Sequence, residues 1–212
     1  ISSWNVSKVD NMSNMFFNAL LFNQDIGSWD TSSVSDMKQT FRGAKAFNQP
    51  ITSAPNRWDV SSVTSMHLMF KDAHAFDQTI EWNGTDGTVL VRNMQQMFEH
   101  ALALNSPVNL NTSLVNNMRQ MFNHARKFNQ PLNFDTAQVT TMRGMFANMN
   151  DFNSSINFTS TSKVQSMRAM FYKAKKFNQP LNFDTSRVNN FRDMFNEAND
   201  FNQDVNTREV GG

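Results

Sequence analysis

One short pattern, Val-x-x-Met-x-x-Met-Phe, recurs along the whole chain and restricts its fold more than any other feature. We use the first Met of each copy as the anchor of a repeat, and a Val stands three residues before every anchor. The anchors are Met12, Met37, Met66, Met94, Met118, Met142, Met167 and, where the Met is replaced, Phe191. Successive anchors lie 24 to 29 residues apart. A unit of this length cannot bury an apolar face alone, so we expect eight units to stack into one array.

The spacing inside each unit predicts a helix. In the fifth unit the apolar residues are separated by three, three, one and three positions, which is the spacing of one helix face. They are Val115, Met118, Met121, Phe122 and Ala125. Short oxygen-bearing side chains are expected to cap the helix starts. They form the runs Thr31-Ser32-Ser33, Asp135-Thr136 and Asp184-Thr185-Ser186. Pro131 is expected to end a helix, and brief strands are predicted at 132–134 and 181–183.

These elements predict an α/β repeat solenoid that is leucine-rich-repeat-like. Each of its eight units is expected to contain a short strand and a roughly three-turn helix. Residues 1–212 are expected to form a single repeat array, curved because helices are wider than strands. Longer, irregular loops are expected near 52–57 and 81–88. Neither end has a polar capping unit, so we expect a fragment of a longer array or ends that stack on something else.

The composition excludes several classes of protein. The chain has 212 residues, of which 39% are hydrophobic, so it can bury a core. Its net charge of +1 gives no overall attraction to nucleic acid or to an anionic membrane. The absence of cysteine excludes disulfides, thiolate zinc sites and a cysteine nucleophile. No apolar run reaches the roughly 20 residues of a membrane helix, so direct membrane insertion is not expected.

A longer consensus surrounds the anchors and carries a family resemblance. It reads Phe-Asn-Gln-Pro-Leu-Asn-Phe-Asp-Thr, followed by the Val-x-x-Met-x-x-Met-Phe pattern, and is seen at 128–146 and 177–195. This consensus resembles the BspA-type leucine-rich repeat of bacterial surface proteins and mycoplasma lipoproteins. The resemblance implies surface display and binding, as in adhesins, with no catalytic residues. Leu104 and Phe191 depart from the consensus but remain apolar, so both are expected to stay buried.

Basic residues recur at two positions, directly after the anchor and eight residues after it. On a helix these two positions lie on one flank. The basic flank comprises Arg119, Arg126, Arg143, Arg168, Lys175 and Arg192. A strip of guanidinium groups can bind carboxylate, sulfate or phosphate. The alternative is a solvated flank neutralised by neighbouring repeats. The tips alternate between Arg126-Lys127, Asn150-Asp151, Lys175-Lys176 and Asn199-Asp200, which would give ion pairs of small value between repeats.

Two histidines form the candidate metal pair. His100 and His124 occupy the same position in adjacent repeats, so their rings are expected to approach each other. Two ligands are fewer than a zinc site needs, and no other cluster supplements them, so no metal is predicted. The column of Met anchors is predicted to be core, because its period is that of the repeat.

Asparagine recurs in the turns, where its side chain is expected to be buried and to bridge neighbouring turns. These residues are Asn23, Asn48, Asn129, Asn178 and Asn202. Glycosylation sequons, which matter only in a secretory eukaryote, occur at Asn5, Asn11, Asn83, Asn111, Asn153 and Asn157.

The sequence therefore predicts a non-catalytic binding or adhesion module at the cell surface or outside the cell. Its partner is expected to be a protein or an anionic polysaccharide. No catalytic constellation or cofactor motif is visible, so neither an enzyme nor a cofactor is expected. Nucleic acid is not expected, because the aromatic residues sit at buried positions. The alternative is a purely structural repeat protein that self-associates end to end through its uncapped ends.

Overall fold

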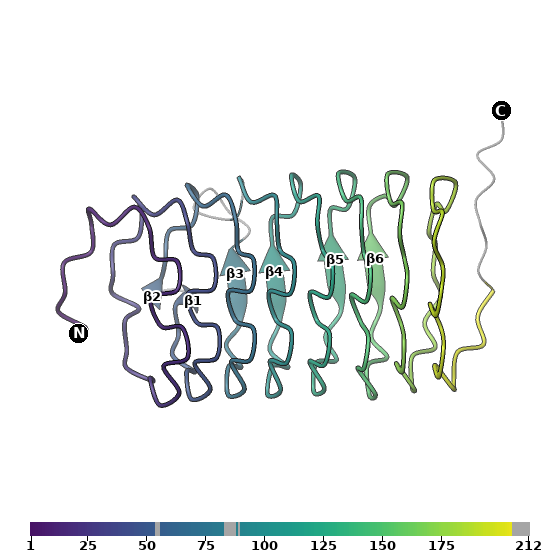
Figure 1. The fold of residues 1–212 in the computed structure, drawn as a ribbon, viewed down its shortest axis with the longest axis horizontal. Coiled ribbons are helices and arrows are strands. Elements are labelled where there is room, and N and C mark those ends of the chain that lie inside the picture. Colours follow the sequence, from purple (N-terminus) through teal and green to yellow (C-terminus); the bar gives the residue numbers. More distant parts are fainter. Residues whose placement is uncertain (54–55, 83–87, 89, 205–212) are drawn as a thin grey trace.

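The computed structural model describes residues 1–53, 56–82, 88 and 90–204. Figure 1 shows an elongated column in which each repeat forms one layer and the layers follow one another in chain order. The layers lie in a nearly straight row, without the pronounced curvature that helices beside strands would produce (Figure 1). The repeats are present, but their units are built differently from the expectation.

The strands are short and pair in twos. They are β1 (Thr52–Ser53), β2 (Asn56–Arg57), β3 (Ile80–Trp82), β4 (Val108–Leu110), β5 (Leu132–Phe134) and β6 (Ile156–Phe158). Strands β3 and β4 are parallel, with Ile80 opposite Val108, and β5 and β6 are parallel, with Leu132 opposite Ile156. The strand predicted at 132–134 is confirmed, whereas 181–183 forms no strand because no backbone ladder joins it to β6.

The loop predicted near 52–57 contains the antiparallel pair β1 and β2, with Thr52 opposite Arg57. Most of the second predicted loop, at 83–87, lies outside the described residues, as do residues 54–55 and 89.

The prediction of an α/β solenoid with three-turn helices is wrong. In the described part of the chain, the segments after the anchors are runs of consecutive turns. Met15 N–H donates to Met12 O at 3.2 Å within its own layer, whereas Asn14 N–H donates to Lys38 O of the next layer at 3.0 Å. An α-helix would direct both bonds into its own segment. About half of the backbone N–H donors in these segments therefore bond to carbonyl groups of the next layer.

No helix in the described part of the chain is long and apolar enough to cross a membrane.

The backbone angles explain why a helix does not form. In every repeat the second and sixth residues after the anchor have positive φ, between 54° and 71°. Such left-handed residues interrupt a right-handed helix every four residues. Nine of these sixteen positions are Asn, Asp, His or Gly, the residue types that most often adopt this conformation. Hydrogen bonds to the neighbouring layers offset the strain at the other positions.

The expected helix caps have a different role. Thr31 Oγ1 donates to Asp59 O of the next layer at 2.8 Å. Thr161, which is not among the expected caps, occupies the same position of another layer, and its Oγ1 donates to Asp184 O at 2.9 Å. Thr136 Oγ1 likewise donates to Ser160 O. These hydroxyl groups connect layers, because the described ranges contain no helix terminus for them to cap.

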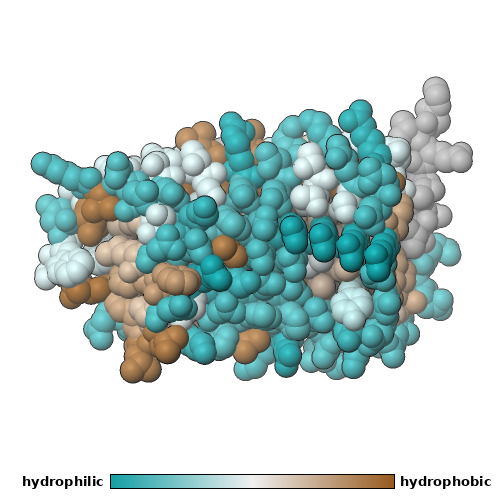
Figure 2. Space-filling model, in the orientation of Figure 1, coloured by the Kyte–Doolittle hydropathy of each residue, from teal (hydrophilic) through white to brown (hydrophobic). Residues whose placement is uncertain are grey.

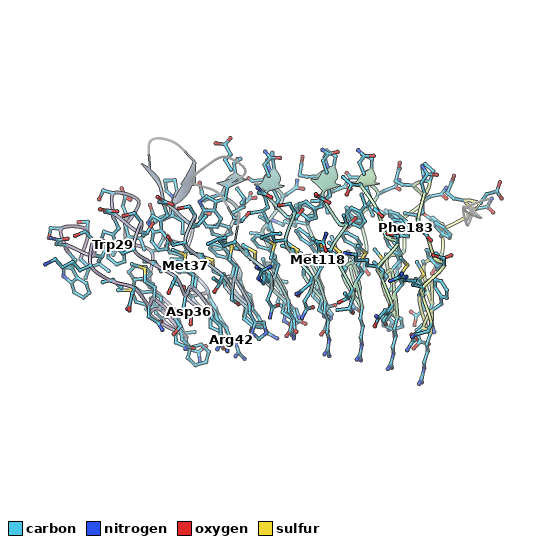
Figure 3. All side chains as sticks on the ribbon, turned by 90° about the horizontal axis from the view of Figure 1, so that it is seen from above. Trp29, Asp36, Met37, Arg42, Met118 and Phe183 are labelled. Atoms are coloured by element: carbon cyan, nitrogen blue, oxygen red, sulfur yellow. The ribbon has the colours of Figure 1, made fainter. Side chains whose placement is uncertain are left out.

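The core consists of columns of like residues. The seven Met anchors are at most 1% exposed, which confirms their predicted place in the core. Figure 3 shows Met37 and Met118 inside the column. A phenylalanine stack runs through all eight layers, with 5.4 to 6.0 Å between neighbouring ring centroids. Leu104 is buried as expected, but Phe191 is 45% exposed because no described layer covers it.

Asparagines form a ladder along another edge of the column. Each Oδ1 accepts the backbone N–H of the equivalent residue in the next layer, as Asn129 does from Asn153 at 2.8 Å. The ladder contains Asn23, Asn48, Asp77, Asn105, Asn129, Asn153, Asn178 and Asn202. The predicted bridging of turns is confirmed. The expectation that these side chains are buried is wrong, because the ladder lies at the surface.

Candidate functional site

Four arginines follow directly after their anchors in consecutive layers. We define Arg119, Arg143, Arg168 and Arg192 as the arginine row. The residue before each anchor aligns the layers through a parallel bridge to the next one, as between Asn117, Thr141 and Ser166. Figure 2 shows a row of strongly hydrophilic side chains along the C-terminal layers, and Figure 3 shows long nitrogen-tipped side chains projecting at one edge of these layers.

The same residues before the anchors also fix the backbone of the arginine row. Asn117 Oδ1 accepts the N–H of Arg119 at 3.1 Å, and Asn190 Oδ1 accepts that of Arg192 at 3.1 Å. Thr141 Oγ1 accepts the N–H of Arg143 at 3.4 Å, and Ser166 Oγ accepts that of Arg168 at 3.5 Å. These short side chains close the same local turn in each layer, so the backbone of each arginine has the same position in its layer.

The row is electrostatically strained by its own charges. Burial lowers the pKa of Arg143 from its usual value, and the charges of Arg119 and Arg168 on either side lower it further. In the described part of the chain only Arg192 of the row has a carboxylate within ion-pair distance, with Arg192 Nε 3.4 Å from Asp193 Oδ2. Arg119 Nε is buried without a hydrogen-bond partner there. Among the described residues, Arg119, Arg143 and Arg168 therefore have no carboxylate that neutralises their charge.

The other two members of the predicted basic flank do not belong to the row. Arg126 and Lys175 were grouped with it by helical geometry, which this backbone does not have. Both side chains are exposed, and no described contact joins them to the row. One ion pair expected between repeats is present, with Lys176 Nζ 2.6 Å from Asp151 Oδ1.

A pocket of about 210 Å³ lies beside the row, with Arg143 and Arg168 among its lining residues. Three other lining residues are small: Gly144, Ala147 and Ala169. The backbone at Gly144 has a φ of 61°, which glycine adopts without strain. The pocket exists because these layers lack the longer side chains found at the same positions elsewhere.

The equivalent residues in the preceding layers show what is missing. Gln96 and Gln120 occupy the position of Gly144, and Glu99 and Asn123 occupy that of Ala147. Sequence reasoning missed the pocket, although aligning the repeats by their anchors reveals these small residues. The predicted helix also gave no indication that the positions of Gly144 and Ala147 lie on a surface shared by neighbouring layers.

A buried polar chain supports one side of the pocket. The carboxylate of Glu99 is buried, and Lys71 Nζ and Gln96 Nε2 both donate to its Oε2. Asn123 Nδ2 donates to Glu99 Oε1 at 2.7 Å, and Asn148 Nδ2 donates to Asn123 Oδ1 at 3.0 Å. The amides of Asn123 and Asn148, which both line the pocket, are thus oriented by the protein itself.

The histidine rings of His100 and His124 do approach each other, with centroids 4.6 Å apart. His100 Nδ1 lies 2.9 Å from Asp72 Oδ1. Burial lowers the pKa of His124, and the charges of His100 and Arg126 lower it further. Within the described ranges no group of three or more His, Cys, Asp or Glu residues can hold a metal ion. The two histidines and Asp72 therefore form a cluster in which His100 has the carboxylate partner.

The side chains of the described sequons take part in local or interlayer hydrogen bonds. Asn5, Asn11 and Asn111 accept from the backbone two residues further on, at 2.8 to 3.1 Å. Asn153 belongs to the ladder, and Asn157 Nδ2 donates to Asn133 Oδ1 at 2.8 Å. Asn83 lies outside the described residues. These asparagines have a structural use in holding turns and layers.

No curated protein and no solved structure matches the chain. A family described as "Mycoplasma protein of unknown function, DUF285" matches it at residues 1–108, 56–133, 83–181 and 132–211. The overlap of these four matches reflects the repeats, and together they cover nearly all of the sequence. The chain therefore belongs to the DUF285 family.

Proposed function

We propose that this chain is a non-catalytic binding module that holds an anionic polymer along the arginine row. The observation that carries the proposal is the recurrence of four arginines at one position of consecutive, backbone-bridged layers. In the described part of the chain, only Arg192 of the four has a carboxylate within ion-pair distance. A polyanion would relieve the repulsion between the arginines. It would also make several linked contacts, so its avidity would exceed that of any single exposed pair.

The proposed polymer is an anionic polysaccharide, because an extended acidic peptide does not match the spacing of hydrogen-bonded layers. An extended peptide repeats its like-facing side chains about every 6.6–6.8 Å, which is twice its rise per residue. Hydrogen-bonded layers are only about 4.8 Å apart. Acidic side chains on a strand would therefore lose register with the row within a few layers. We place the module at the cell surface or outside the cell, because its consensus at 128–146 and 177–195 resembles the BspA-type repeat of bacterial surface proteins.

The test replaces all four arginines of the row by Gln and measures retention on a heparin column at about 0.15 M salt, where the Debye length is about 8 Å. We expect the parent to be retained and the fourfold variant to pass through, with its melting temperature close to the parent's. The matched control replaces the exposed residues Lys8, Lys45, Lys127 and Lys175 by Gln.

The control removes the same charge from outside the row, so it should remain on the column. If the parent is not retained, the chain does not bind polyanions and the proposal is wrong. If the control loses retention as completely as the row variant, binding depends on total charge, and the row has no special role.

A further inference from the structure

We propose that the pocket beside Arg143 and Arg168 binds one sugar residue that carries an acidic group, and so selects which anionic polymer the row holds. This inference rests on the proposed function and names the chemistry that it recognises. The row alone would bind many polyanions. The pocket lies beside two arginines of the row, Arg143 and Arg168, and its shape can select one component of the polymer.

The size of the pocket suits one ring. Its volume of about 210 Å³ is below the range of about 300–1,000 Å³ typical of sites for drug-sized ligands. The small residues Gly144, Ala147 and Ala169 open the pocket, and Tyr172 adds an aromatic ring to its lining.

The charges at the pocket require an anionic group on that ring. Arg143 and Arg168 both line it, and two guanidinium groups can hold the oxygens of a carboxylate or sulfate. Asp193 also lines the pocket and would repel an anion. Its Oδ2 lies 3.4 Å from Arg192 Nε, so an arginine of the row already partners this carboxylate.

The amides at the pocket require hydroxyl groups as well. Asn148 Nδ2 donates to Asn123 Oδ1, which leaves Asn148 Oδ1 as an acceptor without a partner among the described side chains. A carboxylate or sulfate has no proton to donate to this oxygen, whereas a sugar hydroxyl does. The chain from Glu99 through Asn123 holds the Asn148 amide in place before any ligand arrives. This preorganisation reduces the entropy lost on binding.

The test fills the pocket without changing charge, by Ala169→Gln. Gln39, Gln96 and Gln120 occupy the equivalent position with φ between 54° and 59°, and Ala169 has a φ of 54°, so the backbone accepts Gln there. The matched control is Leu68→Gln, at the same position of a distant layer with a φ of 62°. Urea midpoints close to the parent's establish that both variants are folded.

Binding is measured by NMR titration of the full chain with glucuronic acid, glucose 6-sulfate, glucose, sodium sulfate and tetraglutamate. We expect one or both acidic sugars to bind the parent and Leu68→Gln at least about tenfold more tightly than the other probes, and Ala169→Gln to lose about tenfold or more. The comparison of the two acidic sugars identifies the preferred acid. Amide shifts at Gly144 and Ala147 should locate the binding.

Three outcomes overturn the inference: no binding of either acidic sugar, equal binding of sodium sulfate or tetraglutamate, or unchanged binding by Ala169→Gln. If any of these occurs while the parent still binds heparin through the row, the pocket has no selective role and the proposed function stands. A parent that does not bind heparin removes the proposed function and this inference together.

Discussion

Replacing Phe122 by Ala tests whether the layers share one core. The Phe122 side chain is fully buried, and its ring centroid lies 4.7 to 6.5 Å from those of Phe98, Phe128, Phe134 and Phe146. Phe→Ala changes in cores lower the free energy of unfolding by about 3–5 kcal/mol. Four ring contacts place this site in the upper half of that range. We expect a loss of about 4 kcal/mol.

The assay is urea unfolding followed by far-UV circular dichroism and by tryptophan fluorescence. All four tryptophans lie between residues 4 and 82, in the first half of the column, whereas Phe122 lies in the fifth layer. For an m value of about 2–3 kcal/mol per M, the midpoint should fall by about 1.3–2 M. If the column unfolds cooperatively, both signals will shift together.

Phe17→Ala is the matched control, because Phe17 lies in the first layer and is 43% exposed. It should lower the free energy of unfolding by less than about 1 kcal/mol. A Phe122→Ala curve that overlays the parent's would refute the shared core. A shift in circular dichroism without a shift in fluorescence would instead show that neighbouring layers unfold independently.

Two further perturbations test surface features of the column. Burial lowers the pKa of His67, His74 and His124. Below about pH 6.5 the unfolded chain therefore binds more protons than the folded chain. The free energy of unfolding consequently falls as the pH falls. The urea midpoint should decrease from pH 7.5 to 5, less steeply in His124→Gln, and identical slopes would contradict the assignment. Asn129→Ala removes the acceptor of the Asn153 N–H at 2.8 Å and should cost about 1 kcal/mol, whereas Asn182→Ala, at an exposed side chain outside the ladder, should cost little. Equal thermal midpoints for these two variants would show that the ladder does not stabilise the column.

The repeat sequence was sufficient to predict the repeats, the buried Met column and the recurrence of arginines at one position. Residues at one position of each repeat meet the same position in the next layer, so the buried Met column and the bridging asparagines could be predicted without coordinates. The same reasoning placed four arginines in one row. It failed for Arg126 and Lys175, because their relation to the row depended on helical geometry within a unit.

The tertiary structure alone decided between a helix and a run of turns. Apolar spacings of three, three, one and three fit both, because both bring such residues to one face. The difference lies in where Asn14 N–H and its equivalents find their acceptors, which are carbonyl groups of the next layer. The pocket at Gly144 and Ala147 likewise depends on which layers are neighbours. The periodicity within one segment does not predict hydrogen bonds or pockets between layers. Those features depend on residues that lie about one repeat apart in the sequence.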